Sequence, residues 1–213
     1  GILTLCWLWI SKLRESMKLT ILSKKEFLTT NWAGGTTTQL FIYPSLAEYR
    51  LGNFDFRLSS ATVELEKSEF TSLPGISRKL MILEGEIWIE HQNHHSKKLA
   101  KFDWDEFDGA WKTSSVGLCT DFNIMTAQGF ESQLNSMLIL ENTNENYSLK
   151  STHDFVFIYA FKGEVQLSIG SESNLLREGE LAVLENLGEV SMDIMGIIES
   201  ELVFSLISKT KNT

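Results

Sequence analysis

Short runs in which apolar and polar residues alternate make up most of this chain, and turn-forming residues separate them. Alternation with a period of two puts the apolar side chains on one face, so each run predicts a half-buried β-strand. Helical periodicity is scarce. The predicted strands are residues 19–22, 37–43, 54–63, 79–83, 87–91, 98–102, 117–125, 133–140, 155–161, 165–169, 181–184, 190–194 and 202–207. Strands of this length and spacing predict an all-β protein built from barrels or sandwiches.

The alternating pattern contains two related copies of one motif. Residues 83–89, LEGEIWI, recur as residues 161–167, FKGEVQL, so Gly85 corresponds to Gly163 at an offset of 163 − 85 = 78 residues. This offset is longer than a solenoid repeat. The runs around each Gly-Glu pair predict a β-hairpin that turns at the glycine. We therefore expect two β-rich halves, residues 17–140 and 152–209, with the polar stretch 141–151 as a linker and with early strands able to complete either half.

The first sixteen residues differ from the rest of the chain. Residues 2–10 are an apolar run that is too short to cross a bilayer, which takes about twenty residues. Lys12 and Arg14 follow this run, whereas a secretory signal carries its basic residues ahead of the apolar stretch. We interpret residues 1–16 as a non-native or upstream extension, with Met17 as the native start. Packing of this segment against the β-rich body is the alternative.

Composition and charge narrow the classes of partner. With 213 residues, of which 43% are apolar, the chain can bury one large core or two fused smaller ones. The formal net charge is −9 and basic residues form no run longer than a pair, so we expect no nucleic acid partner. Of the two cysteines, Cys6 and Cys119, the second lies inside a predicted strand. This usage favours a reduced, cytoplasmic chain, and we expect no membrane partner.

Polar residues on two predicted strands share a face. Arg57 and Ser59 fall on the same side of one strand, and Asp121 and Asn123 fall on the same side of another. If both faces point into one barrel, their guanidinium, hydroxyl, carboxamide and carboxylate groups surround a site for a small anionic or zwitterionic ligand. Arg78, just before a third predicted strand, would add a second positive group. A solvated sheet face is the alternative.

Six motifs in the first half point to a known family. In chain order they are residues 32–39 (WAGGTTTQ), 56–61 (FRLSSA), 70–78 (FTSLPGISR), 83–85 (LEG), 107–109 (FDG) and 121–125 (DFNIM). Together they resemble the HutD/Ves family and occur in that family's order, while the second half resembles it mainly through its predicted hairpins. The resemblance implies an all-β bicupin, that is, two fused cupin-like antiparallel β-barrels in one chain with few short helices.

The resemblance also implies a function and a set of site residues. Members of the family are associated with bacterial histidine utilisation, where they are thought to bind a small carboxylate such as formylglutamate and to regulate rather than catalyse. Two positions depart from the family pattern, because Trp32 and Ala33 replace the start of an Asn-Gly-Gly-Gly segment and Gln39 replaces a glutamate. The ligand-binding residues implied are Thr37, Gln39, Arg57, Ser59, Arg78, Asp108, Asp121 and Asn123.

Metal and cofactor binding are not expected from this sequence. Cupin barrels often hold a metal through a His-x-His pair and a glutamate, but the matching positions 79–82 read Lys-Leu-Met-Ile. His91, His94 and His95 fall at a predicted hairpin tip, and we interpret them as part of a solvated loop. His153 alone cannot form a three-ligand site. We therefore predict no metal and no cofactor.

Three functions remain open at this point. The first is a metal-independent protein that binds a small anionic metabolite and regulates or sequesters it, with no catalytic residue. The second is a metal-independent isomerase or hydrolase acting on a small polar metabolite, with Asp121 or Asp108 as the base. The third is a protein-interaction module whose interior is only core. We expect the first, and a homodimer is compatible with each.

Overall fold

The computed structural model describes residues 16–211. Within this range the chain is all-β, and its one helix is a single 3₁₀ turn, η1 (Tyr49–Leu51). The all-β prediction is therefore confirmed. The extension predicted at residues 1–16 lies outside the described residues, apart from Ser16. No helix in the described range has the length and hydropathy of a membrane span.

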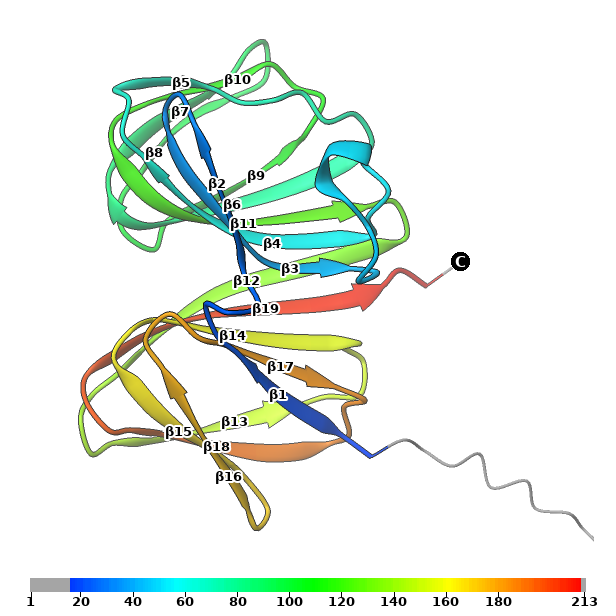
Figure 1. Ribbon diagram of the computed structural model, residues 1–213, viewed down its shortest axis with the longest axis vertical. Coiled ribbons are helices and arrows are strands. Elements are labelled where there is room, and N and C mark those ends of the chain that lie inside the picture. Colours follow the sequence, from blue (N-terminus) through cyan, green and yellow to red (C-terminus); the bar gives the residue numbers. More distant parts are fainter. Residues whose placement is uncertain (1–15, 212–213) are drawn as a thin grey trace, which may run out of the picture.

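The first half of the molecule is built from two antiparallel sheets (Figure 1). The six-stranded sheet has the order β2 (Leu28–Trp32), β3 (Gly35–Tyr43), β4 (Phe56–Val63), β11 (Cys119–Ala127), β6 (Ile76–Gly85) and β9 (Trp104–Asp108). The four-stranded sheet has the order β5 (Lys67–Glu69), β10 (Thr113–Val116), β7 (Ile87–His91) and β8 (Ser96–Leu99).

The second half also consists of two antiparallel sheets. The five-stranded sheet has the order β1 (Lys18–Leu22), β17 (Leu181–Glu185), β14 (Phe155–Lys162), β19 (Ser200–Lys209) and β12 (Phe130–Ile139). The four-stranded sheet has the order β13 (Asn144–Leu149), β18 (Val190–Gly196), β15 (Glu164–Ile169) and β16 (Glu172–Arg177). Strands β1 and β12 lie within residues 17–140 but pair with β17 and β19, so this half takes strands from the range expected to form the first half.

The sheets are open, which differs from the closed barrels that the resemblance implied. Figure 1 shows the two halves stacked along the long axis of the molecule. In each half a larger sheet lies with a four-stranded one, and among the described residues no hydrogen-bonded ladder joins the edge of one sheet to the other. The reason is that the chain passes between sheets through corners and loops, which leave the edge strands of each sheet unpaired.

The repeated Gly-Glu motif forms a corner between two sheets and not the predicted hairpin. β6 ends at Gly85 in the six-stranded sheet, and β7 begins two residues later in the four-stranded sheet. β14 and β15 flank Gly163 in the same way in the second half. Both glycines have positive φ, +83° and +88°, and a Cβ would clash with the carbonyl oxygen of Leu118 or the hydroxyl of Ser200. Glycine is required because both the φ angle and the space exclude a side chain.

The polar stretch 141–151 is not a linker, because β13 occupies most of it. This strand pairs with β18 over six residues and lies at the edge of its sheet. Its outward residues are exposed, while Tyr147 and Leu149 point inward, where the Tyr147 ring lies 4.8 Å from that of Phe204. The sequence hides this strand because two inward residues among asparagines, serines and threonines are too few to mark an alternating run.

The two halves share a hydrophobic core. One cluster of buried residues belongs to the second half and another to the first, but a third combines both. In this shared cluster the Phe157 ring of β14 lies 4.8 Å from the Phe41 ring of β3 and 5.9 Å from the Phe56 ring of β4. The six-stranded and five-stranded sheets therefore pack on each other through aromatic side chains.

Candidate functional site

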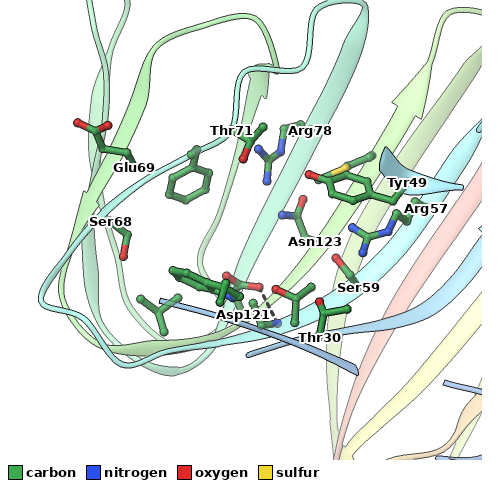
Figure 2. A pocket seen from close by; sticks show the side chains of 16 residues that line it. Thr30, Tyr49, Arg57, Ser59, Ser68, Glu69, Thr71, Arg78, Asp121 and Asn123 are labelled. Atoms are coloured by element: carbon green, nitrogen blue, oxygen red, sulfur yellow. Dashed lines mark hydrogen bonds between the residues drawn. The ribbon is translucent and has the colours of Figure 1, made fainter. Parts of the chain in front are cut away.

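A cavity of about 360 Å³ lies in the first half of the molecule (Figure 2). Its polar wall comes mainly from β4, β11 and β6, which are adjacent strands of the six-stranded sheet. Other lining residues come from β2, β5 and η1. A cavity of this volume is large enough to enclose a small metabolite.

The alternation of side chains along two strands puts polar groups into this cavity. Arg57 and Ser59 reach it from β4, and Asp121 and Asn123 reach it from β11, with Asn123 directly opposite Ser59 in the ladder. Arg78 joins them from β6, on the other side of β11. The shared face expected from the sequence is confirmed, and it borders a cavity instead of forming a solvated sheet face.

Arg57 is fixed at two points of its side chain. Its Nε donates a hydrogen bond of 2.8 Å to Gln39 Oε1, and its Cζ lies 4.1 Å from the centre of the Tyr49 ring. Burial lowers the pKa of Arg57 below its usual value, yet an arginine remains charged at neutral pH. Because Gln39 is neutral, it orients Arg57 and leaves the charge of the guanidinium uncancelled. A glutamate at this position would cancel that charge.

Arg78 contributes a second buried positive charge. Its Cζ lies 5.2 Å from the centre of the Phe70 ring and 5.2 Å from that of Phe107, so aromatic rings flank the guanidinium. Burial lowers the pKa of Arg78 to about 10, and the charge of Asp121 opposes that shift. The guanidinium therefore stays protonated at neutral pH, and no described residue forms an ion pair with it within 4.0 Å.

Asp121 is the buried acidic group of the cavity, which is also lined by the exposed Glu69. Its Oδ1 accepts a hydrogen bond of 3.2 Å from the backbone N–H of Ala61. Burial raises the pKa of Asp121 to about 7, against the opposing effects of that hydrogen bond and of the Arg78 charge. The carboxyl is thus only partly charged at neutral pH, and the buried part of the lining is positive because two guanidiniums face it, while the second carboxyl side chain, Glu69, lies at the exposed rim.

Three buried polar atoms at this cavity have no hydrogen-bond partner among the described residues. They are the Oγ of Ser68, the Nε of Arg78 and the Oδ1 of Asn123. Leaving a buried polar atom unpaired costs on the order of 1–3 kcal/mol, so native proteins rarely do it without a reason. Their convergence on one cavity indicates a place where a polar ligand completes the hydrogen bonding.

Some of the site residues predicted from the sequence line the cavity, and others do not. Thr37 lines the cavity with the four residues of β4 and β11 and with Arg78. Gln39 does not line the cavity but accepts the hydrogen bond from Arg57. Asp108 is exposed, lies outside the cavity and accepts a hydrogen bond of 2.8 Å from the backbone N–H of Ala110. Asp108 therefore orders a turn in this structure and does not line the cavity, although it lies opposite Ser77 in the β6–β9 ladder.

Several residues of the site were not predicted. Tyr49 stacks on Arg57 from η1, Phe70 flanks Arg78 from the segment after β5, and Ser68 belongs to the three-residue β5. None of these residues belongs to an alternating run, so the pattern of apolar and polar positions carries no signal for them. They become neighbours of the arginines only when the sheets pack.

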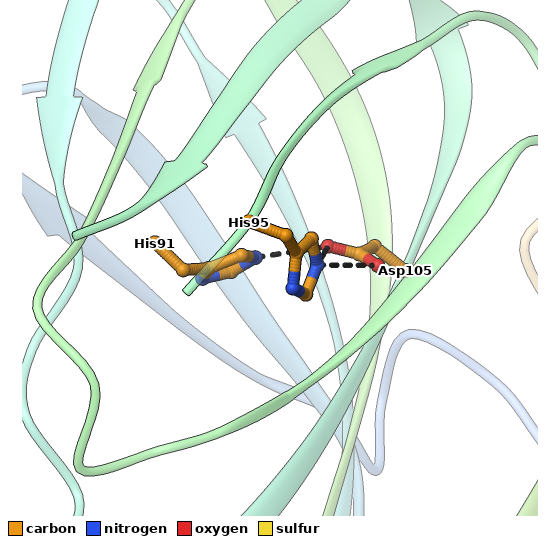
Figure 3. A group of neighbouring side chains, drawn as sticks. All are labelled: His91, His95 and Asp105. Carbon is orange, nitrogen blue, oxygen red and sulfur yellow. Dashed lines mark hydrogen bonds and ion pairs between the residues drawn. The ribbon is translucent and has the colours of Figure 1, made fainter. Parts of the chain in front are cut away.

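Of the three neighbouring histidines that we predicted to form a solvated loop, His94 and His95 are exposed, but His91 is buried. His91 is 1% exposed, and its Nε2 lies 2.9 Å from Asp105 Oδ2, while the half-exposed His95 approaches the same oxygen at 2.8 Å (Figure 3). The His94 ring stacks on Trp111 at 3.8 Å. The imidazoles have partners because Asp105 and Trp111, both distant in sequence from the β7 strand, lie against them. No histidine of the described chain lines the cavity itself, and the cupin metal positions on β6 carry no metal-ligating side chains.

The antiparallel sheets give this chain an all-β fold whose neighbours among solved structures are cupin-like. YhhW from Escherichia coli, of known structure, has this architecture and matches with a TM-score of 0.69 at 10% identity, covering 92% of this chain and 100% of its own. The sequence narrows the class further, because the HutD family model matches residues 24–199. The chain belongs to the HutD family.

Two solved structures are especially similar in fold. PA5104 from Pseudomonas aeruginosa PAO1, a conserved protein of unknown function, matches with a TM-score of 0.78 and 18% identity, covering 90% of this chain and all of that one. HutD from Pseudomonas fluorescens SBW25, solved in a formate condition, matches with a TM-score of 0.70 and 16% identity over 91% of this chain and 100% of its own. Among proteins with curated descriptions, none has a significantly similar sequence.

Proposed function

We propose that this protein binds a small carboxylate such as formylglutamate in the cavity of its first half and acts as a regulatory or sequestering protein. The observation that carries the proposal is the group of three unpartnered buried polar atoms, which surround the same cavity as two buried arginines. In this proposal the chain is a cytoplasmic bicupin with cupin-like halves at residues 17–140 and 152–209, where β1, β12 and β13 complete the sheets of the second half, and the ligand occupies the first half.

The charge of the cavity supports an anionic ligand. Arg57 and Arg78 remain protonated at neutral pH, and the pKa of Asp121 at about 7 means that this carboxyl cancels only part of their charge. The other acidic residue of the lining, Glu69, is exposed to solvent, which screens its attraction for the buried guanidiniums. A buried cation without a counter-ion is costly, so a carboxylate that pairs with a guanidinium replaces lost hydration with charge-assisted hydrogen bonds. The planar guanidinium matches a carboxylate in two parallel hydrogen bonds.

The neutral groups of the cavity support a ligand with further polar atoms. Asn123 offers an amide, and Ser59 and Ser68 offer hydroxyls that both donate and accept. An N-formyl amino acid carries a carboxylate for a guanidinium and an amide for these groups.

The experiment is a calorimetric titration with N-formylglutamate, with glutamate and formate as fragments. We expect Arg57→Met to weaken binding about 100-fold, because a charge-assisted hydrogen bond to a buried group contributes about 1.5–3 kcal/mol. Methionine keeps the length and apolar stem of the side chain, so packing against Tyr49 is retained. Arg177→Met is the matched control, because Arg177 is a mostly exposed arginine of the second half.

Two results would contradict this proposal. One is an absence of binding by the wild-type protein to the carboxylate series at millimolar concentrations. The other is an equal affinity in Arg57→Met and Arg177→Met, which would place any bound anion outside the cavity. Circular dichroism on each variant tests whether the β fold is retained, so that a loss of carboxylate affinity can be assigned to the site.

A further inference from the structure

A second group of chemically active side chains lies apart from the carboxylate cavity. His91 ends β7, His95 closes the turn to β8, and Asp105 lies on β9. The turn brings the histidines together, since the N–H of His91 donates a hydrogen bond of 2.8 Å to the carbonyl of His95. Figure 3 shows both imidazoles directed at the carboxylate of Asp105. None of the three residues lines the cavity described above.

The three side chains converge closely enough to share one ion. One ligand atom from each lies within 4.8 Å of the others. Both imidazole Nε2 atoms meet the same Asp105 Oδ2, at 2.9 Å from His91 and 2.8 Å from His95. Ligand atoms at about 2.0–2.2 Å from a tetrahedral Zn²⁺ lie about 3.3 Å apart, so small side-chain movements convert this arrangement into a coordination shell.

A hydrogen-bond relay orients His91 for this role. The Nδ1 of His91 lies 2.7 Å from Thr113 Oγ1, and that hydroxyl donates to the carbonyl of Trp111 at 3.3 Å. Because the hydroxyl has one proton, we assign the proton between His91 and Thr113 to Nδ1. In this tautomer Nε2 presents its lone pair toward Asp105, as a metal ligand must, and a bound cation would take the place of the proton in the 2.9 Å contact between Nε2 and Asp105 Oδ2. Outer partners of this kind hold metal-ligating histidines in other proteins.

Packing holds the cluster in place and leaves one side open. His91 is 1% and Asp105 7% exposed, and the His91 ring lies 4.4 Å from that of Phe107. The side chain of His95 is 41% exposed, which gives an ion access from solvent. Two ligands are thus pre-organised in the interior and the third can close over the ion from the surface.

We propose that His91, His95 and Asp105 form a site for a borderline divalent cation, with Zn²⁺ as the preferred ion. Two imidazoles and one carboxylate suit Zn²⁺ and related transition metals, whereas Mg²⁺ and Ca²⁺ prefer all-oxygen shells. Three protein ligands leave a fourth position for water or for a ligand atom. Such an ion would tie together β7, β9 and the intervening turn.

The test is a titration of the full chain with ZnCl₂ by calorimetry, repeated with CoCl₂ to record the visible absorption of the bound ion. We expect one Zn²⁺ per chain, a Co²⁺ spectrum of low-symmetry four-coordinate type, and no comparable binding of Mg²⁺. At Zn²⁺ about 100-fold above the dissociation constant, Tm should rise by about 5–10 °C.

Variants locate the ion. His95→Ala removes a half-exposed ligand with little effect on the fold and should weaken Zn²⁺ binding more than 100-fold, while Thr113→Val, which removes only the outer partner of His91, should weaken it 10–100-fold. His94→Ala is the matched control, because His94 stacks on Trp111 and is not one of the three ligands. Absence of Zn²⁺ binding by the wild-type chain overturns the proposal, as does equal affinity in His95→Ala and His94→Ala.

Discussion

At the scale of single residues, Asp121 shows how position changes the chemistry of a side chain. It is 5% exposed on β11 and receives one backbone hydrogen bond, from Ala61. Burial, which disfavours the charged form, is stronger than the opposing effects of that bond and of the Arg78 charge, and raises the pKa of Asp121 to about 7. Stability therefore depends on this carboxyl between its unfolded pKa near 3.8 and its folded pKa near 7.

We predict that Asp121→Asn flattens the pH dependence of the unfolding free energy. Between pH 4 and 7 the folded wild-type chain keeps a proton that the unfolded chain has lost, so wild-type stability falls as the pH rises through this window. Asparagine can still accept the hydrogen bond from Ala61 but does not titrate. Relative to wild type the variant should gain roughly 3–4 kcal/mol from pH 4 to pH 8, measured by urea unfolding.

The control for this prediction is Asp193→Asn, a substitution of the same type at an exposed carboxylate on β18. It should change stability by a similar amount at every pH. A difference between Asp121→Asn and wild type that stays constant from pH 4 to pH 8 would show that the carboxyl is ionised in the folded state throughout.

At the scale of elements, the corners after β6 and β14 direct each half of the fold. At both corners the chain leaves a large sheet and enters a four-stranded one, and a glycine with positive φ occupies the point of closest approach. The ladder opposite each corner is also irregular, with register shifts at Thr120/Asp121 and at Ala160/Lys162. Such irregularities bend strands, which helps the chain to turn from one sheet into the next.

We predict that Gly85→Ala destabilises the protein more than Gly75→Ala. Both glycines have φ near +80°, so both substitutions carry the cost of a left-handed backbone, about 1–2 kcal/mol. Only at Gly85 would the new Cβ collide with the backbone of residues 118–119, whereas at Gly75 no atom lies within 4 Å. The collision should add about 1–3 kcal/mol, measured by urea unfolding of both variants. Equal losses would indicate that the β11 backbone yields without cost.

At the scale of the whole molecule, the shared aromatic core couples the unfolding of the two halves. The cluster that contains Phe56 also contains Phe157, Leu181 and Val203 of the second half, and all four are nearly fully buried. Strands β1 and β12, which both lie before residue 140, also belong to the five-stranded sheet of the second half. A protein whose halves bury surface against each other in this way is expected to unfold as one unit.

We predict that the protein unfolds in a single transition. A destabilising substitution in the second half should therefore also lower the midpoint at which the first half unfolds. All four tryptophans of the described range, Trp32, Trp88, Trp104 and Trp111, lie in the first half. Phe157→Ala removes a fully buried ring of the second half and should lower the unfolding free energy by about 3–5 kcal/mol, as followed by tryptophan fluorescence.

The matched control is Leu175→Ala on β16, where the side chain is 38% exposed and the fluorescence transition should hardly move. Circular dichroism of the same samples reports both halves. Two separate transitions, with the fluorescence midpoint unchanged in Phe157→Ala, would show that the halves unfold independently.

Much of this protein follows from local pattern. The period-two alternation of β4 and β11 indicates both strands and the common face of Arg57, Ser59, Asp121 and Asn123, because side-chain direction on a strand depends only on the backbone. The six motifs indicate the family, which the match over residues 24–199 shows. Strands whose residues are all exposed, such as β2, escape detection because no buried apolar position marks a period.

The sequence by itself determined the all-β class, most of the strands and which residues of a strand share a face. Only the tertiary structure decided that the repeated glycines form corners between sheets, that Gln39 accepts a hydrogen bond from Arg57 and that two histidines contact Asp105. The physical reason is range. Strand periodicity is a property of neighbouring residues, whereas a cavity, an aromatic stack or a cluster of ligands depends on contacts between residues far apart in the chain, such as Phe70 with Arg78 or His91 with Asp105.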